Sequence, residues 1–296
     1  MEKYFIARIR GNLHNKTVRD FFLSNFVSKQ KMNYLVSNNA TFINGEVATY
    51  DTLIKQNDYI MIDISKYESL NYQPINQKID ILYEDDYILV INKPSKMIVY
   101  SDDQNNTNTV ANLIAGYFKQ NDLDLTVRHC HRLDTDTTGC LLYAKDLITH
   151  SAISNMFEKN QIEKWYFAIV EGMLLKSGTI NYAIGKDRHI NGKMIAYKNG
   201  QPSLTTYEVI DHSNTATLVK AKIETGRTHQ IRVHFSTILH PLYGDTLYGA
   251  ITSSRVMLHC HSLKFVHPIT GKKIEIKCNV PSDFRQILKS NDLSCK

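Results

Sequence analysis

The chain has 296 residues, with 35 Lys and Arg against 29 Asp and Glu, which gives a formal net charge of +6. This length exceeds a typical single domain, so we expect one large domain and one small module, and the moderate positive charge suits a polyanionic partner without requiring one. The five cysteines form no close CxxC pair, which argues against a disulfide framework or zinc ribbon and indicates a reducing cytoplasm. No stretch approaches the roughly 20 apolar residues that span a bilayer, so we expect a cytoplasmic protein with no membrane contact.

In the first 65 residues the spacing of apolar side chains changes from the period of a strand to that of a helix and back. Alternation over residues 4–9 predicts a strand, and Val18, Phe21 and Phe22 share one face of an expected helix. A second helix is expected after its cap Ser28. Residues 41–44 and 58–63 are predicted strands, with an Asn-Gly hairpin turn at residues 44–45.

This order of elements, with SKQKMNYLVSNNATFINGEVA at residues 28–48, resembles the S4 RNA-binding module. The resemblance implies an S4-like domain over residues 1–66, in which cations on the two helices contact phosphates. Without the resemblance, such scattered charges indicate only a solvated helix face. Asn39 stands where the family commonly has Gly, and Asn tolerates the positive φ of such a turn. The four cations are Lys16, Arg19, Lys29 and Lys31.

Residues 67–78 lack periodicity and contain Pro74, which predicts a linker, and a large domain is expected over residues 79–296. Within it we expect a hairpin over residues 79–91 and an amphipathic helix over residues 109–118. A further helix should begin after its cap Asp146 and end near residue 160.

The stretch HCHRLDTDTTGCLLYAK at residues 129–145 places acids and turn formers before a buried apolar run. Its residues alone predict two extended segments that meet at a tight turn, with Leu133 in the first segment. HRLDxxTxG followed by LLxxAK resembles the first motif of the RluA-type pseudouridine synthases, with Thr138 where the family usually has Ser. The resemblance makes Asp134 the catalytic residue, and Arg132 the group that occupies the space left by an extruded uridine.

Two later stretches extend the resemblance. EKWYFAIVEG at residues 163–172 is a predicted buried strand in which periodicity alone makes Tyr166 a packing residue, whereas KxYxAxVxG matches the motif of the family's active-site tyrosine. TGRTHQIRVH at residues 225–234 matches the third motif, and its alternation predicts a strand with Gln230 and Arg232 on one side. By family position Arg232 is the partner of the catalytic aspartate, and Arg227 is the next candidate and a phosphate ligand.

The resemblance runs through most of residues 79–290, with two departures at glycine positions: Ser95 and Lys96 replace the small residue and Gly of a KPxG segment, and Leu239 replaces the Gly before HP. It implies an α+β pseudouridine synthase fold whose mixed, mainly antiparallel central sheet is flanked by helices and loops. The implied function is isomerisation of uridines in structured RNA, chiefly large-subunit ribosomal RNA, by a monomer that needs no cofactor and no metal. His131 and Lys164 complete the expected RNA contacts.

Two other functions are weighed against this one. The HxHxxD string, with the histidines at 129, 131, 259 and 261, suits a metal-dependent hydrolase, but metal binding leaves the following TxGxLLxxAK unexplained. A non-catalytic RNA-binding ribosome assembly factor would share both domains. The intact Asp134, Tyr166 and Arg232 argue against that reading.

Overall fold

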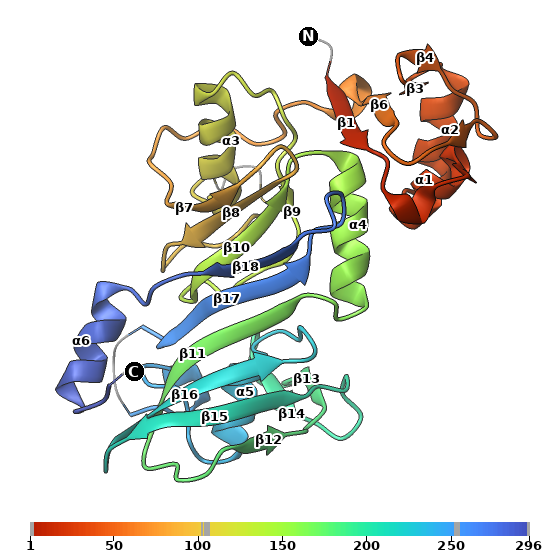
Figure 1. Cartoon of the computed structure of the whole chain (residues 1–296). Coiled ribbons are helices and arrows are strands. Elements are labelled where there is room, and N and C mark those ends of the chain that lie inside the picture. Colours follow the sequence, from red (N-terminus) through yellow and green to blue (C-terminus); the bar gives the residue numbers. More distant parts are fainter. Residues whose placement is uncertain (1–2, 102, 104–106, 252–254, 295–296) are drawn as a thin grey trace.

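The N-terminal residues form a small module of one sheet and two helices, shown in red and orange in Figure 1. The structure is a computed structural model that describes residues 3–101, 103, 107–251 and 255–294. Helices α1 (Val18–Ser24) and α2 (Lys29–Ser37) cover the sheet, whose strand order is β1 (Tyr4–Arg8), β6 (Tyr59–Asp63), β3 (Thr41–Ile43) and β4 (Glu46–Val47). Strands β2 (Lys16–Thr17) and β5 (Leu53–Ile54) form a separate pair.

The local signals in this module are confirmed. Asn44 (φ 51°) and Gly45 (φ 91°) form the turn between β3 and β4, and Asn39 has the expected positive φ of 54°. Ser28 occupies the N-cap position of α2, although its side chain makes no capping hydrogen bond. Thr17 caps α1 instead with a reciprocal capping box to Asp20.

The module shares an apolar core with the large domain. Leu147, Ile148 and Ile269 of the large domain belong to the same buried cluster as the module's own core side chains. The hydroxyl of Tyr87 donates to the Ile6 carbonyl at 2.7 Å, and its ring lies 5.8 Å from that of Phe5. The two units are therefore joined by packing as well as by the connecting chain.

The connecting segment, residues 68–80, contains no helix or strand but is fixed to the large domain. The Glu68 carboxylate, with a fully buried side chain, pairs with Arg128 at 2.8 Å. Asn71 Oδ1 accepts from the Val127 N–H at 2.8 Å, and Asn112 Nδ2 donates to the Gln73 carbonyl at 2.9 Å.

The large domain is built on a sheet of ten strands within the described residues. Its main path is β12-β15-β16-β11-β17-β10-β8-β7, while β18 pairs with β17 and β9 with β10. All pairs are antiparallel except β10 with β17, so the expected mixed, mainly antiparallel sheet is confirmed. The strand bounds are β7 (Ile81–Glu84), β8 (Ile88–Lys93), β9 (Arg128–His129), β10 (Thr138–Ala144), β11 (Glu163–Glu171), β12 (Gly178–Ile180), β15 (Thr205–His212), β16 (Ala216–Ile223), β17 (Leu258–Val266) and β18 (Lys273–Lys277).

Four helices and a separate hairpin surround this sheet in the described part of the chain. Figure 1 shows α4 and α6 on opposite sides of it, α4 beside the N-terminal module. None of the helices that the structure describes is long and apolar enough to cross a membrane. The helices are α3 (Val110–Gln120), α4 (Leu147–Glu158), α5 (Gln230–Thr237) and α6 (Ser282–Ser290), and the hairpin strands are β13 (Ile184–Lys186) and β14 (Met194–Ala196).

The strand predicted over residues 230–234 is wrong, because this segment is the first part of helix α5. All six residues from Gln230 to Phe235 are buried, so their alternation of polar and apolar side chains does not separate an exposed face from a buried one. Tertiary partners decide the conformation: the Gln230 side chain bonds Thr225 and Leu204, and His234 bonds Thr205.

The positions where family glycines are replaced keep a glycine-like backbone. Lys96 has a φ of 59° and Leu239 a φ of 65°, both in the left-handed region that L side chains rarely adopt. Leu239 follows the C-cap of α5, where its N–H donates to the Ser236 carbonyl at 3.0 Å, and its side chain is 87% exposed. Its side chain thus adds strain at a helix end without adding much burial.

We expect Leu239→Gly to raise the free energy of unfolding by about 1 kcal/mol, because glycine removes the Cβ penalty of the left-handed conformation. Urea unfolding of the purified protein measures the change. Leu239→Ala is the control, since alanine keeps the Cβ and should give no gain. An equal gain in both variants would contradict this explanation.

Asp146 caps α4 as expected, but from a buried position. Its Oδ1 accepts the N–H groups of Ile148 and Thr149, each at 2.8 Å, and its Oδ2 accepts the Thr149 hydroxyl at 2.6 Å. Burial nevertheless raises the pKa of Asp146 to about 6. Because the folded protein binds this proton more tightly than the unfolded chain, the associated stability is present below about pH 4 and lost as the pH rises through 6.

Asp146→Asn keeps an oxygen that can cap the helix and removes the buried charge. We therefore expect its free energy of unfolding at pH 8 to exceed that of the parent by about 1 to 3 kcal/mol, at about 1.4 kcal/mol per pKa unit, and the gain to shrink towards pH 4.5. Asp20→Asn on α1 is the control and should lower the free energy of unfolding at pH 8, since hydrogen bonds from Thr17 lower the pKa of that partly exposed carboxyl. A gain at pH 8 no larger than at pH 4.5 would refute the prediction.

Candidate active site

Asp134 lies on the segment 130–137, which connects β9 to β10. The predicted extended segment after Gly139 is confirmed as part of β10, but the segment that contains Leu133 and the tight turn after it are wrong. Leu133 lies in the long connection, and the strand that pairs antiparallel with β10 is β9, which ends at His129. The fully buried Lys93 ammonium holds this connection by donating to the carbonyls of Pro94, Thr135 and Thr137 at 2.8, 2.9 and 3.0 Å. Burial lowers the pKa of Lys93 to about 7, against the opposing negative charges of Asp134 and Asp136.

A glycine at the start of β10 allows the strand to approach β17. Gly139 has a φ of 105°, and a Cβ there would collide with the Cys260 carbonyl. Next to it, Thr138 Oγ1 bonds His259 Nδ1 at 2.8 Å, in the short parallel pairing of β10 with β17. The hydroxyl of Thr138, which stands where the family usually has Ser, thus fixes the start of β10 against β17.

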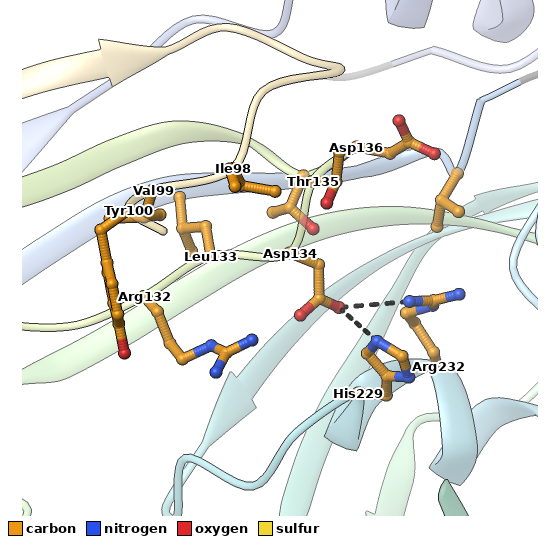
Figure 2. Close-up of a pocket in the computed structure, with 12 residues that line it drawn as sticks. Ile98, Val99, Tyr100, Arg132, Leu133, Asp134, Thr135, Asp136, His229 and Arg232 are labelled. Atoms are coloured by element: carbon orange, nitrogen blue, oxygen red, sulfur yellow. Dashed lines mark hydrogen bonds and ion pairs between the residues drawn. The ribbon is translucent and has the colours of Figure 1, made fainter. Parts of the chain in front are cut away.

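A single guanidinium connects Asp134 to a second carboxylate. Arg232 on α5 binds Asp245 with two parallel hydrogen bonds, Nε to Oδ2 at 2.7 Å and Nη2 to Oδ1 at 2.9 Å. Its remaining nitrogen, Nη1, lies 3.5 Å from Asp134 Oδ2. Figure 2 marks this contact with a dashed line. Burial disfavours the charged guanidinium, but the bonds and charge of Asp245, aided by Asp134, outweigh it and raise the pKa of Arg232.

His229 faces the same carboxylate from one helical turn before Arg232. Its Nε2 lies 4.0 Å from Asp134 Oδ2, and its Nδ1 lies 2.9 Å from the hydroxyl of Tyr248. That hydroxyl already accepts the N–H of Met194 at 2.9 Å, so we assign its proton to His229 Nδ1 and the ring proton to Nε2. Burial lowers the pKa of His229, which keeps the ring neutral at neutral pH.

Two adjoining cavities of about 290 and 330 Å³ meet at Asp134. The first continues to Tyr100 and Val256, and the second continues to Tyr166 and Arg227. The Asp134 side chain is 21% exposed and lines both. The residues common to both linings are Arg132, Leu133, Asp134, Thr137, His229 and Arg232.

Tyr166 and Lys164 reach the second cavity from strand β11. The predicted alternation is confirmed, since both are buried while Trp165 between them is half-buried. Burial raises the pKa of Tyr166 well above its usual value, so the hydroxyl remains protonated at neutral pH. Burial also lowers the pKa of Lys164, whose ammonium lies 5.2 Å from the centre of the Phe157 ring.

The other predicted contact residues of the large domain occupy different positions around the cavities. Arg132 is exposed and lines both cavities, and Arg227 lines the second while donating to the Pro202 carbonyl at 3.2 Å. His131 lines the second cavity, but its Nε2 accepts the Leu142 N–H at 3.1 Å, and burial lowers its pKa to about 3. Its ring is therefore neutral and tied to β10.

The four cations predicted for the N-terminal module line neither cavity. Lys16, Arg19 and Lys29 are exposed, and the Arg19 guanidinium stacks 4.6 Å from the centre of the Tyr50 ring. Lys31 is half-buried, and desolvation together with the nearby charge of Arg128 lowers its pKa. Their role in RNA binding stays a prediction.

The histidines of the hydrolase alternative have other partners. His259 Nε2 and His261 Nδ1 both lie within hydrogen-bond distance of the Cys278 carbonyl, at 3.1 and 2.8 Å, and His129 stacks on Tyr100 with ring centres 4.0 Å apart. No three His, Cys, Asp or Glu side chains among the described residues are grouped so that they could hold a metal ion.

Sequence reasoning missed three residues of this arrangement, namely Asp245, His229 and Tyr248. Asp245 and Tyr248 stand in GDTLYG at residues 244–249, to which sequence reasoning assigned no role. His229 was missed because the predicted strand would place it and Arg232 on opposite faces. Residues three apart on a helix share one face, which is how both reach Asp134.

Comparisons with known proteins show the family of this chain. The family model described as RNA pseudouridylate synthase matches residues 87–237. The RNA pseudouridine synthase YhcT of Bacillus subtilis is 36% identical over 253 residues, 84% of each chain. The ribosomal large subunit pseudouridine synthase D of Vibrio parahaemolyticus is 33% identical over 258 residues, 81% of this chain and 79% of its own.

Solved structures show the same fold. Human RNA pseudouridylate synthase domain containing 4 matches with a TM-score of 0.62 and 23% identity over 73% of this chain and 94% of its own. Human RNA pseudouridylate synthase domain containing 1 matches with a TM-score of 0.57 and 26% identity over 73% of this chain and 96% of its own. The expected pseudouridine synthase fold is confirmed, and the chain belongs to the RNA pseudouridylate synthase family as an RNA pseudouridine synthase.

Proposed function

We propose that this enzyme isomerises specific uridines of large-subunit ribosomal RNA as a monomer, with Asp134 as its catalytic carboxylate. The observation that carries the proposal is the position of Asp134, where two cavities adjoin and Arg232 and His229 approach one carboxylate oxygen. The ribosomal target is supported by relatives named ribosomal large subunit pseudouridine synthase D, such as the Vibrio parahaemolyticus protein.

Isomerisation breaks the bond from N1 of the base to C1′ of the ribose, turns the uracil, and joins C5 to the same carbon. The proton lost from C5 is balanced by the proton gained at N1, so no redox partner or energy source is consumed. Asp134 either attacks the nucleotide as a nucleophile or removes a ribose proton to give a glycal. Both routes use the negative carboxylate, and the Arg232 guanidinium supplies the positive charge beside it.

Asp245 prepares Arg232 for this role. The two oxygens of the Asp245 carboxylate accept hydrogen bonds from two nitrogens of the guanidinium and fix its plane. Its third nitrogen, Nη1, therefore points at Asp134 before any RNA binds. Preorganised charge of this kind needs no rearrangement at the moment of reaction, which is where enzymes gain most from electrostatics.

The cavities provide space for a uridine turned out of its helix. Extrusion costs a few kcal/mol of stacking, which contacts in the pocket have to offset. Tyr166 lines the second cavity beside Asp134, where its ring can stack on the extruded base and its protonated hydroxyl can donate a hydrogen bond. Arg132, exposed at the rim of both cavities, is placed to fill the gap left in the RNA.

Asp134→Asn should lower pseudouridine formation about a thousandfold or more, the scale of losing a nucleophile, while RNA affinity stays within about twofold. Pseudouridine mapping on unmodified, transcribed large-subunit ribosomal RNA, with transfer RNA in parallel, measures both rate and target. Asp136→Asn removes the same charge from the same segment and should keep readily measurable turnover. Turnover by Asp134→Asn would refute the catalytic assignment, whereas wild-type product found on transfer RNA alone would refute the ribosomal target.

Tyr166→Phe retains the ring and loses the hydroxyl. We expect its single-turnover rate to fall by roughly a hundredfold, the low end for a group that acts on a proton, with RNA affinity unchanged. Tyr166→Leu should lose affinity as well, because an aliphatic side chain stacks poorly on a base. An unchanged rate in Tyr166→Phe would show that the hydroxyl takes no part in the reaction.

A further inference from the structure

The β13–β14 hairpin is a small basic projection from the large domain. Ile184 pairs with Ala196 and Lys186 with Met194, and residues 187–193 form the loop between the strands. Residues 186–198 contain four Lys and Arg side chains and one His against a single Asp. In a chain with a net charge of only +6, this is a local concentration of positive charge.

The cations of this hairpin are not paired with carboxylates in the described part of the chain. None of Lys186, Arg188, Lys193 and Lys198 forms an ion pair with a carboxylate of the described residues. Asp187, the one acid, accepts instead the backbone N–H groups of His189 and Ile190, at 2.8 and 3.3 Å.

Two exposed aromatic side chains flank the same surface. Tyr182 precedes β13 and is 48% exposed, and Tyr197 follows β14 and is 40% exposed. Cations interleaved with accessible aromatic rings are the combination that holds a nucleic acid strand, because the cations contact phosphates and the rings stack on bases.

The hairpin is joined directly to the groups around Asp134. The backbone N–H of Met194 donates to the Tyr248 hydroxyl at 2.9 Å, and that hydroxyl bonds His229 Nδ1 at 2.9 Å. The Arg232 guanidinium lies 4.9 Å from the centre of the Tyr248 ring, and the Lys193 ammonium lies 5.7 Å from it. Tyr248 therefore touches both residues that face Asp134 and two residues of the hairpin.

The hairpin also packs on the helix that carries Arg232. Ile184, Val233 of α5 and Tyr248 form one small buried cluster, and Met194 and Ala196 pack against it. This cluster is separate from the main core, so the hairpin, α5 and Tyr248 form a local unit. A shift of the hairpin is transmitted to this unit by packing as well as by hydrogen bonds.

A run of charges on an exposed hairpin is most often a solvated surface. Two features distinguish this hairpin, namely cations that form no ion pair with a carboxylate of the described residues and a direct hydrogen bond to the groups around Asp134. We infer that the β13–β14 hairpin binds the phosphate backbone of the substrate RNA, and that Tyr248 couples this binding to the placement of His229 and Arg232 about Asp134. The inference rests on the proposed catalytic role of Asp134.

Contacts between the hairpin and the RNA backbone would help to offset the cost of extruding the uridine. Turning a uridine out of a helix costs a few kcal/mol, and backbone contacts beside the cavity contribute binding free energy that does not depend on sequence. Contacts made by the hairpin also hold Tyr248 in place, so an RNA strand bound to the hairpin stabilises the preorganised arrangement of His229 and Arg232. Tyr248 is thus a positioning residue that acts through its two neighbours.

The double variant Lys186→Gln/Arg188→Gln tests the surface. With transcribed large-subunit ribosomal RNA as the probe, we expect affinity to fall on the order of tenfold, and the slope of log K against log salt to flatten by about 1.5. Lys119→Gln/Lys289→Gln removes the same two charges from exposed sites on α3 and α6, and should leave affinity, slope and turnover unchanged. Equal affinity and slope in Lys186→Gln/Arg188→Gln and the parent would overturn the proposed surface.

Tyr248→Phe tests the coupling. It keeps the ring beneath Arg232 and loses the hydroxyl, so we expect the single-turnover rate at saturating RNA to fall at least tenfold while RNA affinity and thermal unfolding stay near those of the parent. A merely structural role would lower stability and leave the rate per folded molecule unchanged, and that result would overturn the coupling. Failure of the catalytic proposal itself would appear separately, as turnover in Asp134→Asn.

Discussion

The site depends on how one buried guanidinium divides its donors between two carboxylates. Arg232 commits two nitrogens to Asp245 and directs the third towards Asp134. A buried cation needs a partner, since an ion left without one costs about 3 to 5 kcal/mol, and Asp245 supplies that partner with two hydrogen bonds. The same bonds that stabilise the interior therefore fix the direction of positive charge at the cavity.

The central sheet brings these partners together from distant parts of the sequence. Lys93 at the end of β8 holds the segment with Asp134 from one side, and Gly139 allows β10 to approach β17 on the other. Tyr166 enters from β11, two strands away from β10. Only a closely packed sheet can hold residues from such separate strands within reach of one nucleotide.

Much of the fold was predictable because local signals and tertiary packing agree. The caps Thr17 and Asp146, the Asn-Gly turn and the alternation of β11 all form as their residues indicate. Helix α5 was not predictable, since its buried face is defined by partners such as Asp245 and Thr205, which lie elsewhere in the chain. Asp134 was singled out by its motif, whereas the contact between His229 and Tyr248 exists only once α5 is helical and Tyr248 is packed against it.

The apolar core shared by the N-terminal module and the large domain restricts which RNA shapes could contact both. Because Leu147, Ile148 and Ile269 are buried with the side chains of the N-terminal module, and Tyr87 is bonded to β1, the module is set at one angle and cannot swing on its connecting chain. An RNA that contacts both the module and the cavity would have to present two contact sites at one fixed spacing. If RNA binds both units, an unfolded or wrongly folded transcript would not present the two contact sites at that spacing.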